Sequence, residues 1–187
     1  MNYNHVHTIK DIIYIQYSII LARERFNIPD GIQIQYHHRG YVKSIFMGLL
    51  KSGKKWSEII GEIENNDKEL KCAYCGKESD KLLNEPIIPI TPKIKEKFIS
   101  RGVEVEPGNF VNVCTECNKL RNELGLYEFF KKKMPDNIFY YQNIPIKLEK
   151  KYLRAIYYFH EFSNTLNKED LDGDKDLTVL DIDFILH

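Results

Sequence analysis

The sequence has no net charge, because 27 Lys and Arg residues are balanced by 27 Asp and Glu residues. This balance excludes a strongly basic protein that binds nucleic acid over its whole surface. The chain also has no internal repeat and no low-complexity linker, which excludes a solenoid or a string of small modules. Its 187 residues are 43% apolar, enough to bury a globular core without disulfides.

Long apolar runs are missing too. The most apolar early stretch, "IIYIQYSIILA" at 12–22, contains two tyrosines and a glutamine and is too short to span a bilayer. We therefore expect a buried helix there and no membrane partner. No secretory leader is visible, so we expect a cytoplasmic protein whose four cysteines are reduced.

Apolar spacing and turn residues predict a mostly helical α+β fold. Thr8 is the expected N-cap of the first helix. The expected helices cover 8–26, 41–51, 57–64, 91–102, 115–133 (loosened at Gly125) and 148–166, a hairpin covers 70–80, and strands cover 85–90 and 109–113. We expect three parts, namely a helical N-terminal subdomain (1–69), a zinc module (70–133) and a C-terminal helix with an acidic loop (134–187).

All four cysteines fall in two pairs, Cys72-x-x-Cys75 and Cys114-x-x-Cys117. Two such pairs, each beside a turn, can place four thiolates around one tetrahedral Zn²⁺. Buried free cysteines and a redox pair are the alternatives, but two matching spacings favour zinc. A closed four-cysteine site has no open position for water, so we expect this zinc to be structural.

The segments "CAYCG", "EPIIP" and "NFVNVCTECNKLR" resemble the HNH endonuclease family in its four-cysteine, zinc-containing form. The resemblance covers residues 70 to about 130. It implies a ββα-metal unit, in which a hairpin and a helix hold one divalent ion. It also implies metal-dependent hydrolysis of DNA phosphodiesters, with Mg²⁺ or Mn²⁺ as the catalytic ion.

The resemblance also implies roles for individual residues. Glu85 matches the acidic residue that binds the catalytic metal or stands beside it. Asn109 matches the residue that orients the hairpin, and Asn118 matches the metal ligand on the helix. Arg121 takes the place of a lysine that contacts phosphate, and Pro86 falls where the family has the histidine that acts as general base.

Pro86 is the main departure from the family pattern. A general base contributes roughly 10²–10⁴-fold to such a reaction, and proline has no proton acceptor on its side chain. Glu85 cannot share a face with Pro86, because strand neighbours point to opposite sides. His37 and His38 could supply the base from the N-terminal subdomain, although we favour exposed residues ahead of a helix. Two branches stay open: a nuclease that works without this histidine, and an inactive module that only binds DNA or a protein.

Basic residues are concentrated in the middle of the chain, where twelve Lys and Arg stand against nine Asp and Glu over 70–133. Such side chains make the sequence-independent phosphate contacts of DNA-binding proteins. The candidates are Lys93, Lys95, Lys97, Arg101, Lys119, Arg121 and Lys131–Lys133. Solvated helix faces are an equal alternative. For the chain as a whole, a further alternative is an interaction protein that zinc and calcium stabilise and that does not bind nucleic acid. The sequence does not determine the oligomeric state, and a homodimer is possible.

The C-terminal stretch "DLDGDKDLTVLD" resembles an EF-hand calcium loop, closest to the dockerin variant. Loop positions 1, 3, 5, 7, 9 and 12 are Asp170, Asp172, Asp174, Asp176, Thr178 and Asp181. Alternating oxygen ligands let a loop wrap a hard cation, so we expect structural Ca²⁺. Lys175 stands at the sixth position, where glycine is usual. The alternative is a solvated acidic turn before a helix.

Overall fold

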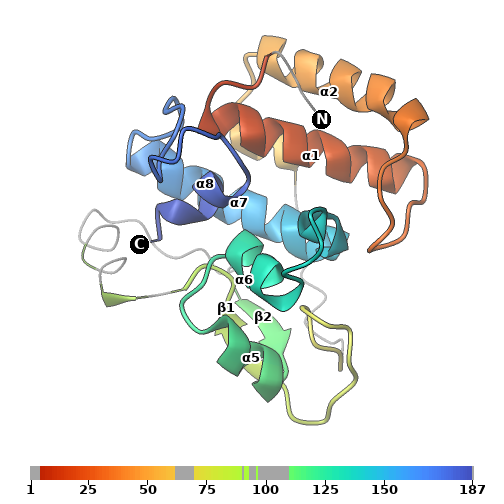
Figure 1. Cartoon of the computed structure of the whole chain (residues 1–187), viewed down its shortest axis with the longest axis vertical. Coiled ribbons are helices and arrows are strands. Elements are labelled where there is room, and N and C mark those ends of the chain that lie inside the picture. The colour runs from red at the N-terminus through yellow and green to blue at the C-terminus, as the bar shows by residue number, and fades with distance from the viewer. Residues whose placement is uncertain (1–4, 62–69, 90, 93–95, 97–109, 187) are drawn as a thin grey trace.

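The computed structural model describes residues 5–61, 70–89, 91–92, 96 and 110–186. It confirms the expected mostly helical α+β class (Figure 1). The elements are α1 (Ile9–Arg25), α2 (Arg39–Lys51), α3 (Trp56–Ile60), β1 (Leu83–Pro86), β2 (Phe110–Val113), α5 (Thr115–Arg121), α6 (Leu126–Lys133), α7 (Ile146–Phe162) and α8 (Leu180–Phe184), with short 3₁₀ turns at Tyr36–His38 and Tyr140–Asn143.

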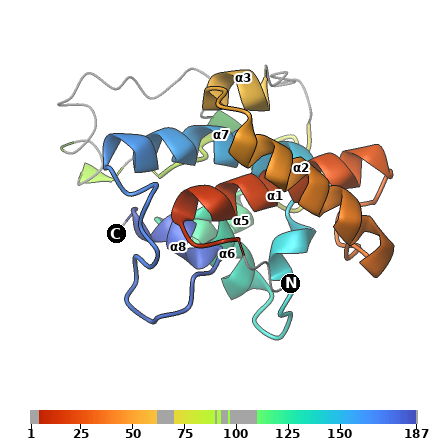
Figure 2. The same cartoon turned by 90° about the horizontal axis from the view of Figure 1, so that it is seen from above.

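The first helix, α1, begins as the sequence predicts. Thr8 caps it by accepting a hydrogen bond from the Asp11 N–H (3.3 Å), and the Asp11 carboxylate accepts in turn from the Thr8 N–H (3.0 Å). This reciprocal arrangement satisfies donors that would otherwise lack partners at the helix start. The helix is buried on most of its surface because it packs against both α2 and α7. In the view from above, α2 lies across α1 (Figure 2).

Helix α7 forms the middle of the molecule between the N-terminal helices and the small sheet (Figure 1). It contacts α1 on one side and α3 on another. Aromatic side chains make the second contact, since the Trp56 ring of α3 stacks on Tyr157 of α7 (4.9 Å between centroids). The same Trp56 ring also stacks on Tyr14 of α1 (5.6 Å). Stacked rings of this kind add to the apolar burial that holds the helices together.

The sheet has two antiparallel strands, with Glu85 opposite Val111 and Pro86 opposite Phe110. The strand expected over 85–90 instead covers Leu83–Pro86, so it begins two residues earlier and ends four residues earlier. Two physical reasons end it there. Pro86 has no N–H to continue the ladder, and the Arg121 guanidinium binds the carbonyls of Pro86 (2.8 Å) and Ile87 (2.6 Å).

The single helix expected over 115–133 is two helices, α5 and α6, with a sharp break between them. Asn122 ends α5 with a positive φ (49°), which asparagine adopts more often than most residues. Gly125 then serves as N-cap of α6, and its N–H donates to the Glu128 carboxylate (2.9 Å). The sequence prediction was wrong here, although Gly125 does mark the second helix start.

Other boundaries shift by smaller amounts. Helix α2 begins at Arg39, and α7 covers Ile146–Phe162 where 148–166 was expected. Most of the helix expected over 91–102 lies outside the described residues, as do residues 62–64 of the helix expected over 57–64. Within the described part, no helix is both long and apolar enough to cross a membrane. The three-part division of the chain stays a prediction.

Candidate functional site

The four cysteines meet at one place. The Sγ atoms of Cys72, Cys75, Cys114 and Cys117 all lie within 4.8 Å of one another, and those of Cys75 and Cys114 are 3.9 Å apart. Tetrahedral Zn–S bonds of about 2.3 Å would separate the sulfurs by about 3.8 Å. Three of the cysteines are buried, and all four are free thiols. The cluster can therefore hold a metal ion such as zinc.

Backbone hydrogen bonds position both cysteine pairs. In the first pair, the Gly76 N–H donates to the Cys72 carbonyl (2.8 Å), and Gly76 takes the positive φ (71°) that this turn needs. In the second pair, Cys114 is the N-cap of α5, and its Sγ accepts from the Cys117 N–H (3.5 Å). The Ala73 N–H donates to the Asn112 carbonyl (2.8 Å), which joins the two turns.

The chemistry of the cluster fits a cation. Burial raises the pKa of the Cys117 thiol far above its ordinary value, and the neighbouring Cys72 adds to the shift. Four thiolates so close together would repel one another, and their charge is compensated when they coordinate a metal. No other titratable group completes this cluster among the residues that the structure describes.

Beside the cluster, the structure brings together two residues that the family resemblance assigns to the catalytic metal. The Asn118 side chain on α5 donates through Nδ2 to Oε1 of Glu85 on β1 (3.2 Å). Both side chains are partly buried, and they lie 33 residues apart in the sequence. Asn109, the third residue of this set, lies outside the described residues.

Arg121 has a structural position in this neighbourhood. Its side chain is buried, and its two terminal nitrogens donate to the carbonyls of Pro86 and Ile87. Its guanidinium also lies 5.7 Å from the ring centre of Tyr74, inside the first cysteine turn. Arg121 thus links the end of β1 to the first cysteine turn through these contacts. The phosphate contact that we expected of Arg121 stays a prediction.

The histidines that could replace the missing base are placed elsewhere. His38 is buried with its ring against Phe26 (4.6 Å between centroids) and His37 (3.9 Å). His160 is buried, with its ring nitrogens 2.9 Å from the Thr165 hydroxyl and from the Ile182 carbonyl. His38 and His160 thus have partners other than the Glu85–Asn118 pair.

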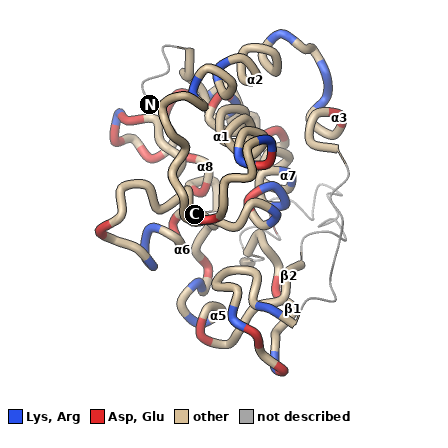
Figure 3. The backbone as a smooth tube through the Cα atoms, turned by 90° about the vertical axis from the view of Figure 1, so that its right-hand side faces the viewer, with Lys and Arg blue, Asp and Glu red and all other residues tan. Residues whose placement is uncertain are grey.

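The basic residues near the site are mixed with acidic ones, as the interspersed colours around α5 show (Figure 3). Lys119 follows Asn118 on α5 and is exposed. The lysines at the end of α6 lie close by, because Lys132 donates to the Leu120 carbonyl (3.5 Å) and Lys133 to the Tyr74 carbonyl (3.4 Å). The remaining candidates for phosphate contacts, Lys93, Lys95, Lys97 and Arg101, lie outside the described residues.

The acidic loop forms a second cluster of carboxylates. Oxygens of Asp170, Asp172 and Asp174 lie within 4.8 Å of one another. Asp170 accepts from the N–H groups of Gly173 (2.7 Å) and Lys175 (2.9 Å), and these hydrogen bonds lower its pKa. Lys175 adopts a positive φ (71°), the conformation for which an EF-hand loop normally has glycine at that position.

The remaining residues of the loop are arranged differently. Asp181 is fully buried, and its two oxygens accept from the N–H groups of Leu171 (2.9 Å) and Thr178 (2.8 Å). Thr178 accepts through its hydroxyl from the Leu180 N–H (3.1 Å). Asp176 and Asp181 do not belong to the group of carboxylates within 4.8 Å. The loop is thus closed by its own backbone, with three carboxylates gathered on its exposed side.

Comparisons with known proteins add no assignment. No protein-family model, no curated protein and no solved structure matches this chain.

Two buried carboxyl groups were missed by sequence reasoning. Glu149 accepts from the Tyr127 hydroxyl (2.9 Å), and burial raises its pKa to about 8. Asp183 accepts from the Tyr152 hydroxyl (2.5 Å) and from the Glu128 N–H (2.8 Å), and burial raises its pKa to about 7. A signal existed for Glu149, which lies on the apolar stripe of α7 at the spacing of its buried neighbours.

Proposed function

We propose that this chain acts on DNA as an HNH-type endonuclease that hydrolyses phosphodiesters with a divalent metal. Glu85 and Asn118 would hold Mg²⁺ or Mn²⁺, and the four cysteines would hold a structural Zn²⁺. The observation that carries the proposal is the contact between Glu85 and Asn118 (3.2 Å) directly beside the cysteine cluster. The family pattern requires a carboxylate on the strand and an amide on the helix to meet at this point.

Each residue has a defined part in this proposal. The bound metal would act as a Lewis acid that stabilises charge developing on the phosphate. Oxygen ligands suit Mg²⁺, so the Asn118 amide would turn to present its oxygen where its nitrogen now faces Glu85. The exposed Lys119 follows Asn118 on α5 and is positioned to contact the DNA backbone.

Pro86 favours a second candidate function, a module that binds DNA or a protein without cutting DNA. Position 86 offers no proton acceptor, and the backbone carbonyl there is bound by Arg121. In the enzyme branch the attacking water would lose its proton to solvent, which makes hydrolysis slow. If the second module binds DNA, the two candidates differ in turnover and not in the surface that contacts the DNA.

A plasmid assay separates the two candidates. Purified protein is incubated with supercoiled DNA in Mg²⁺, in Mn²⁺ and in EDTA, beside the variants Glu85→Ala and Asn118→Ala. Glu123→Ala serves as the matched control, because Glu123 is exposed on the link between α5 and α6. Metal-dependent nicking that disappears in both site variants and persists in the control supports the nuclease. A salt-sensitive gel shift without nicking supports the binding module.

Restoring the base makes the assay more sensitive. The Pro86→His variant places an imidazole where the family has one, and a general base contributes roughly 10²–10⁴-fold. We expect nicking to rise by that order in Pro86→His and to be lost again when Glu85→Ala is added. If Pro86→His folds and still neither nicks nor binds DNA, both forms of the proposal are wrong and an interaction protein remains.

The two cation clusters have stabilising roles in this proposal. We propose Zn²⁺ at the cysteines, since four sulfur ligands suit zinc and leave no open position for water. We propose Ca²⁺ at the acidic loop, supported by the gathering of Asp170, Asp172 and Asp174 and by the positive φ of Lys175. Elemental analysis of the purified protein, with and without added CaCl₂, tests both ions and their stoichiometry.

A further inference from the structure

A cavity of about 690 Å³ lies beside α1. Its wall is made by α1, the segment around Ile34, the turn at 138–142 and the end of the acidic loop at 176–180. Pockets of 300–1,000 Å³ are the size that binds small organic ligands. Glu85 and Asn118 do not line this cavity, although Lys131 is also a candidate for phosphate contact and the loop at 176–180 carries Asp176 and Thr178 of the acidic loop.

The floor of the cavity is apolar with one polar exception. Ile12, Ile15, Gln16 and Ile19 line it from α1, and their spacing places them on one helix face. All four are buried, and Gln16 is only 5% exposed. The Oε1 atom of Gln16 is buried and has no hydrogen-bond partner. A buried acceptor without a donor is costly and is found in few places in a folded protein.

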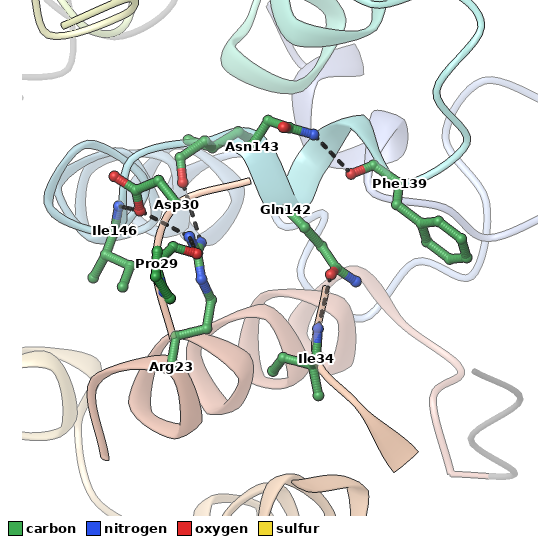
Figure 4. Close-up of polar contacts among 9 residues, drawn as sticks. Arg23, Pro29, Asp30, Ile34, Phe139, Gln142, Asn143 and Ile146 are labelled. Carbon is green, nitrogen blue, oxygen red and sulfur yellow. Dashed lines mark hydrogen bonds and ion pairs between the residues drawn. The ribbon is translucent and has the colours of Figure 1, made fainter. Parts of the chain in front are cut away.

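A second glutamine in the same cavity wall, Gln142, differs from Gln16 because its side-chain oxygen accepts a hydrogen bond. Gln142 is also buried, but its Oε1 accepts from the Ile34 N–H (3.1 Å), and both residues line the cavity (Figure 4). The neighbouring contacts of Arg23 with Asp30 (2.8 Å) and with the Ile144 carbonyl (3.1 Å) hold this wall in place. Gln142 is thus fixed by a hydrogen bond, whereas the Gln16 oxygen in the same wall lacks a donor.

The rim of the cavity carries positive charge. Arg39 and Lys131 line it, and both are exposed, so they lie toward its opening while the isoleucines form its floor. Asp176 is the acidic residue on the same rim. A ligand that fills this space meets an apolar floor, one acceptor that needs a donor, and two cations that favour an anionic group.

We propose that this cavity binds a small organic anion with an aromatic or aliphatic body and at least one N–H or O–H donor. The body packs on the isoleucine floor, the Gln16 side chain turns so that its Oε1 meets the donor, and the anionic group lies between Arg39 and Lys131. The site is separate from the Glu85–Asn118 pair, so its test does not depend on nuclease activity.

The probe 8-anilinonaphthalene-1-sulfonate has this chemistry, because it combines aromatic rings, one N–H and one sulfonate. Its matched partner, N-phenyl-1-naphthylamine, has the same rings and N–H without the anion. Fluorescence titration of the folded protein should give one saturable site for the sulfonate. Gln16→Leu should weaken that site about tenfold, the worth of one hydrogen bond.

Charge variants complete the test. The double variant Arg39→Gln, Lys131→Gln should weaken binding of the sulfonate about tenfold or more. Its affinity for the uncharged N-phenyl-1-naphthylamine should not change. Lys54→Gln is the control, because Lys54 is exposed and does not line the cavity. Gln16→Leu removes an unpaired acceptor, so the unfolding temperature of this variant should match or exceed that of the parent protein. If Gln16→Leu does not fold, the result with the Arg39 and Lys131 variants tests the proposal. Absent saturation, or a titration unchanged by these substitutions, overturns the proposal.

Discussion

The cysteine cluster and the acidic loop are both groups of atoms that could hold a metal ion, but the chain builds them in opposite ways. The cysteines come from two segments about 40 residues apart, and three of the four are buried. The aspartates come from five consecutive positions, and they are mostly exposed. A cation at the cysteines would join distant parts of the chain, whereas a cation at the loop would join only near neighbours.

The difference extends to what each cluster does without an ion. The loop carboxylates already accept hydrogen bonds from their own backbone, as Asp172 does from the Asp174 N–H (3.0 Å) and Asp174 from the Asp176 N–H (2.8 Å). The sulfur atoms of the cysteine cluster have few hydrogen-bond partners apart from one another and the Cys117 N–H. A metal at the sulfur site would therefore be needed for the folded state to be stable. A metal at the oxygen site would only add stability to a loop that is already formed.

The largest effect should come from the sulfur site. Cys114→Ser removes one ligand and the N-cap sulfur of α5, so we expect the free energy of unfolding to fall by more than about 4 kcal/mol. A strong zinc chelator should have the same effect on the unmodified protein. Thermal unfolding by circular dichroism measures both, with the exposed neighbour substitution Thr115→Ala as control. A chelator-resistant protein with no bound zinc would contradict this ranking.

The second largest effect should be a dependence of stability on pH, caused by the two buried carboxyl groups Asp183 and Glu149. Asp183 and Glu149 bind a proton more tightly when folded, with pKa values of about 7 and about 8 against ordinary values of 3.8 and 4.5. The folded chain therefore holds extra protons between those values, and stability falls as pH rises from about 4 to 8, by at most about 1.4 kcal/mol per pH unit per group.

Urea unfolding at several pH values measures this slope. Asp183→Asn keeps the acceptor for the Glu128 N–H but cannot ionise, so its slope should be shallower than that of the parent. The exposed Asp136→Asn serves as control and should leave the slope unchanged. Stability that rises between pH 5 and 8 would show that these carboxyls are ionised in the folded chain.

A smaller effect tests whether the two regions are connected. Asp183 on α8 follows the acidic loop in sequence and binds the first turn of α6, which follows the cysteine cluster. A Cβ at Gly125 would overlap the Asp183 side chain, so Gly125→Ala should cost about 1–3 kcal/mol. Gly48→Ala meets open space on α2 and should stabilise by about 0.5–1 kcal/mol. Equal unfolding temperatures for these two variants would contradict the packing.

The smallest effect is expected at the oxygen site in the absence of calcium. Asp172→Asn should change stability by no more than about 0.5 kcal/mol in EDTA, because Asp172 is exposed. In the parent protein, calcium at 100 times its dissociation constant should add about 2.7 kcal/mol, and this gain should vanish in Asp172→Asn. Calorimetric titration with Ca²⁺ and unfolding scans check both parts. A large destabilisation in EDTA would make the loop as essential as the cysteines.

Local signals decided much of the fold in advance. The Thr8 cap, the apolar spacing of α1 and the paired cysteine spacing each act over a few residues, so the sequence predicts them directly. The bounds of the strand over 85–90 and the single helix over 115–133, expected to be loosened at Gly125, were wrong for physical reasons. Some of these are local, namely Pro86 at the strand end and Asn122 at the helix break. The others are partners distant in sequence, namely Arg121 at the strand end and Asp183 at the start of α6.

The sequence by itself determined that the chain is mostly helical and carries two groups of metal-ligating side chains, because residue type and spacing alone set those properties. Only the tertiary structure decided which of those side chains meet. It placed Asn118 against Glu85, buried Arg121 under the end of β1, and left Gln16 without a donor in a cavity wall. Such contacts join residues that no local pattern relates, since they arise only when helices and strands pack.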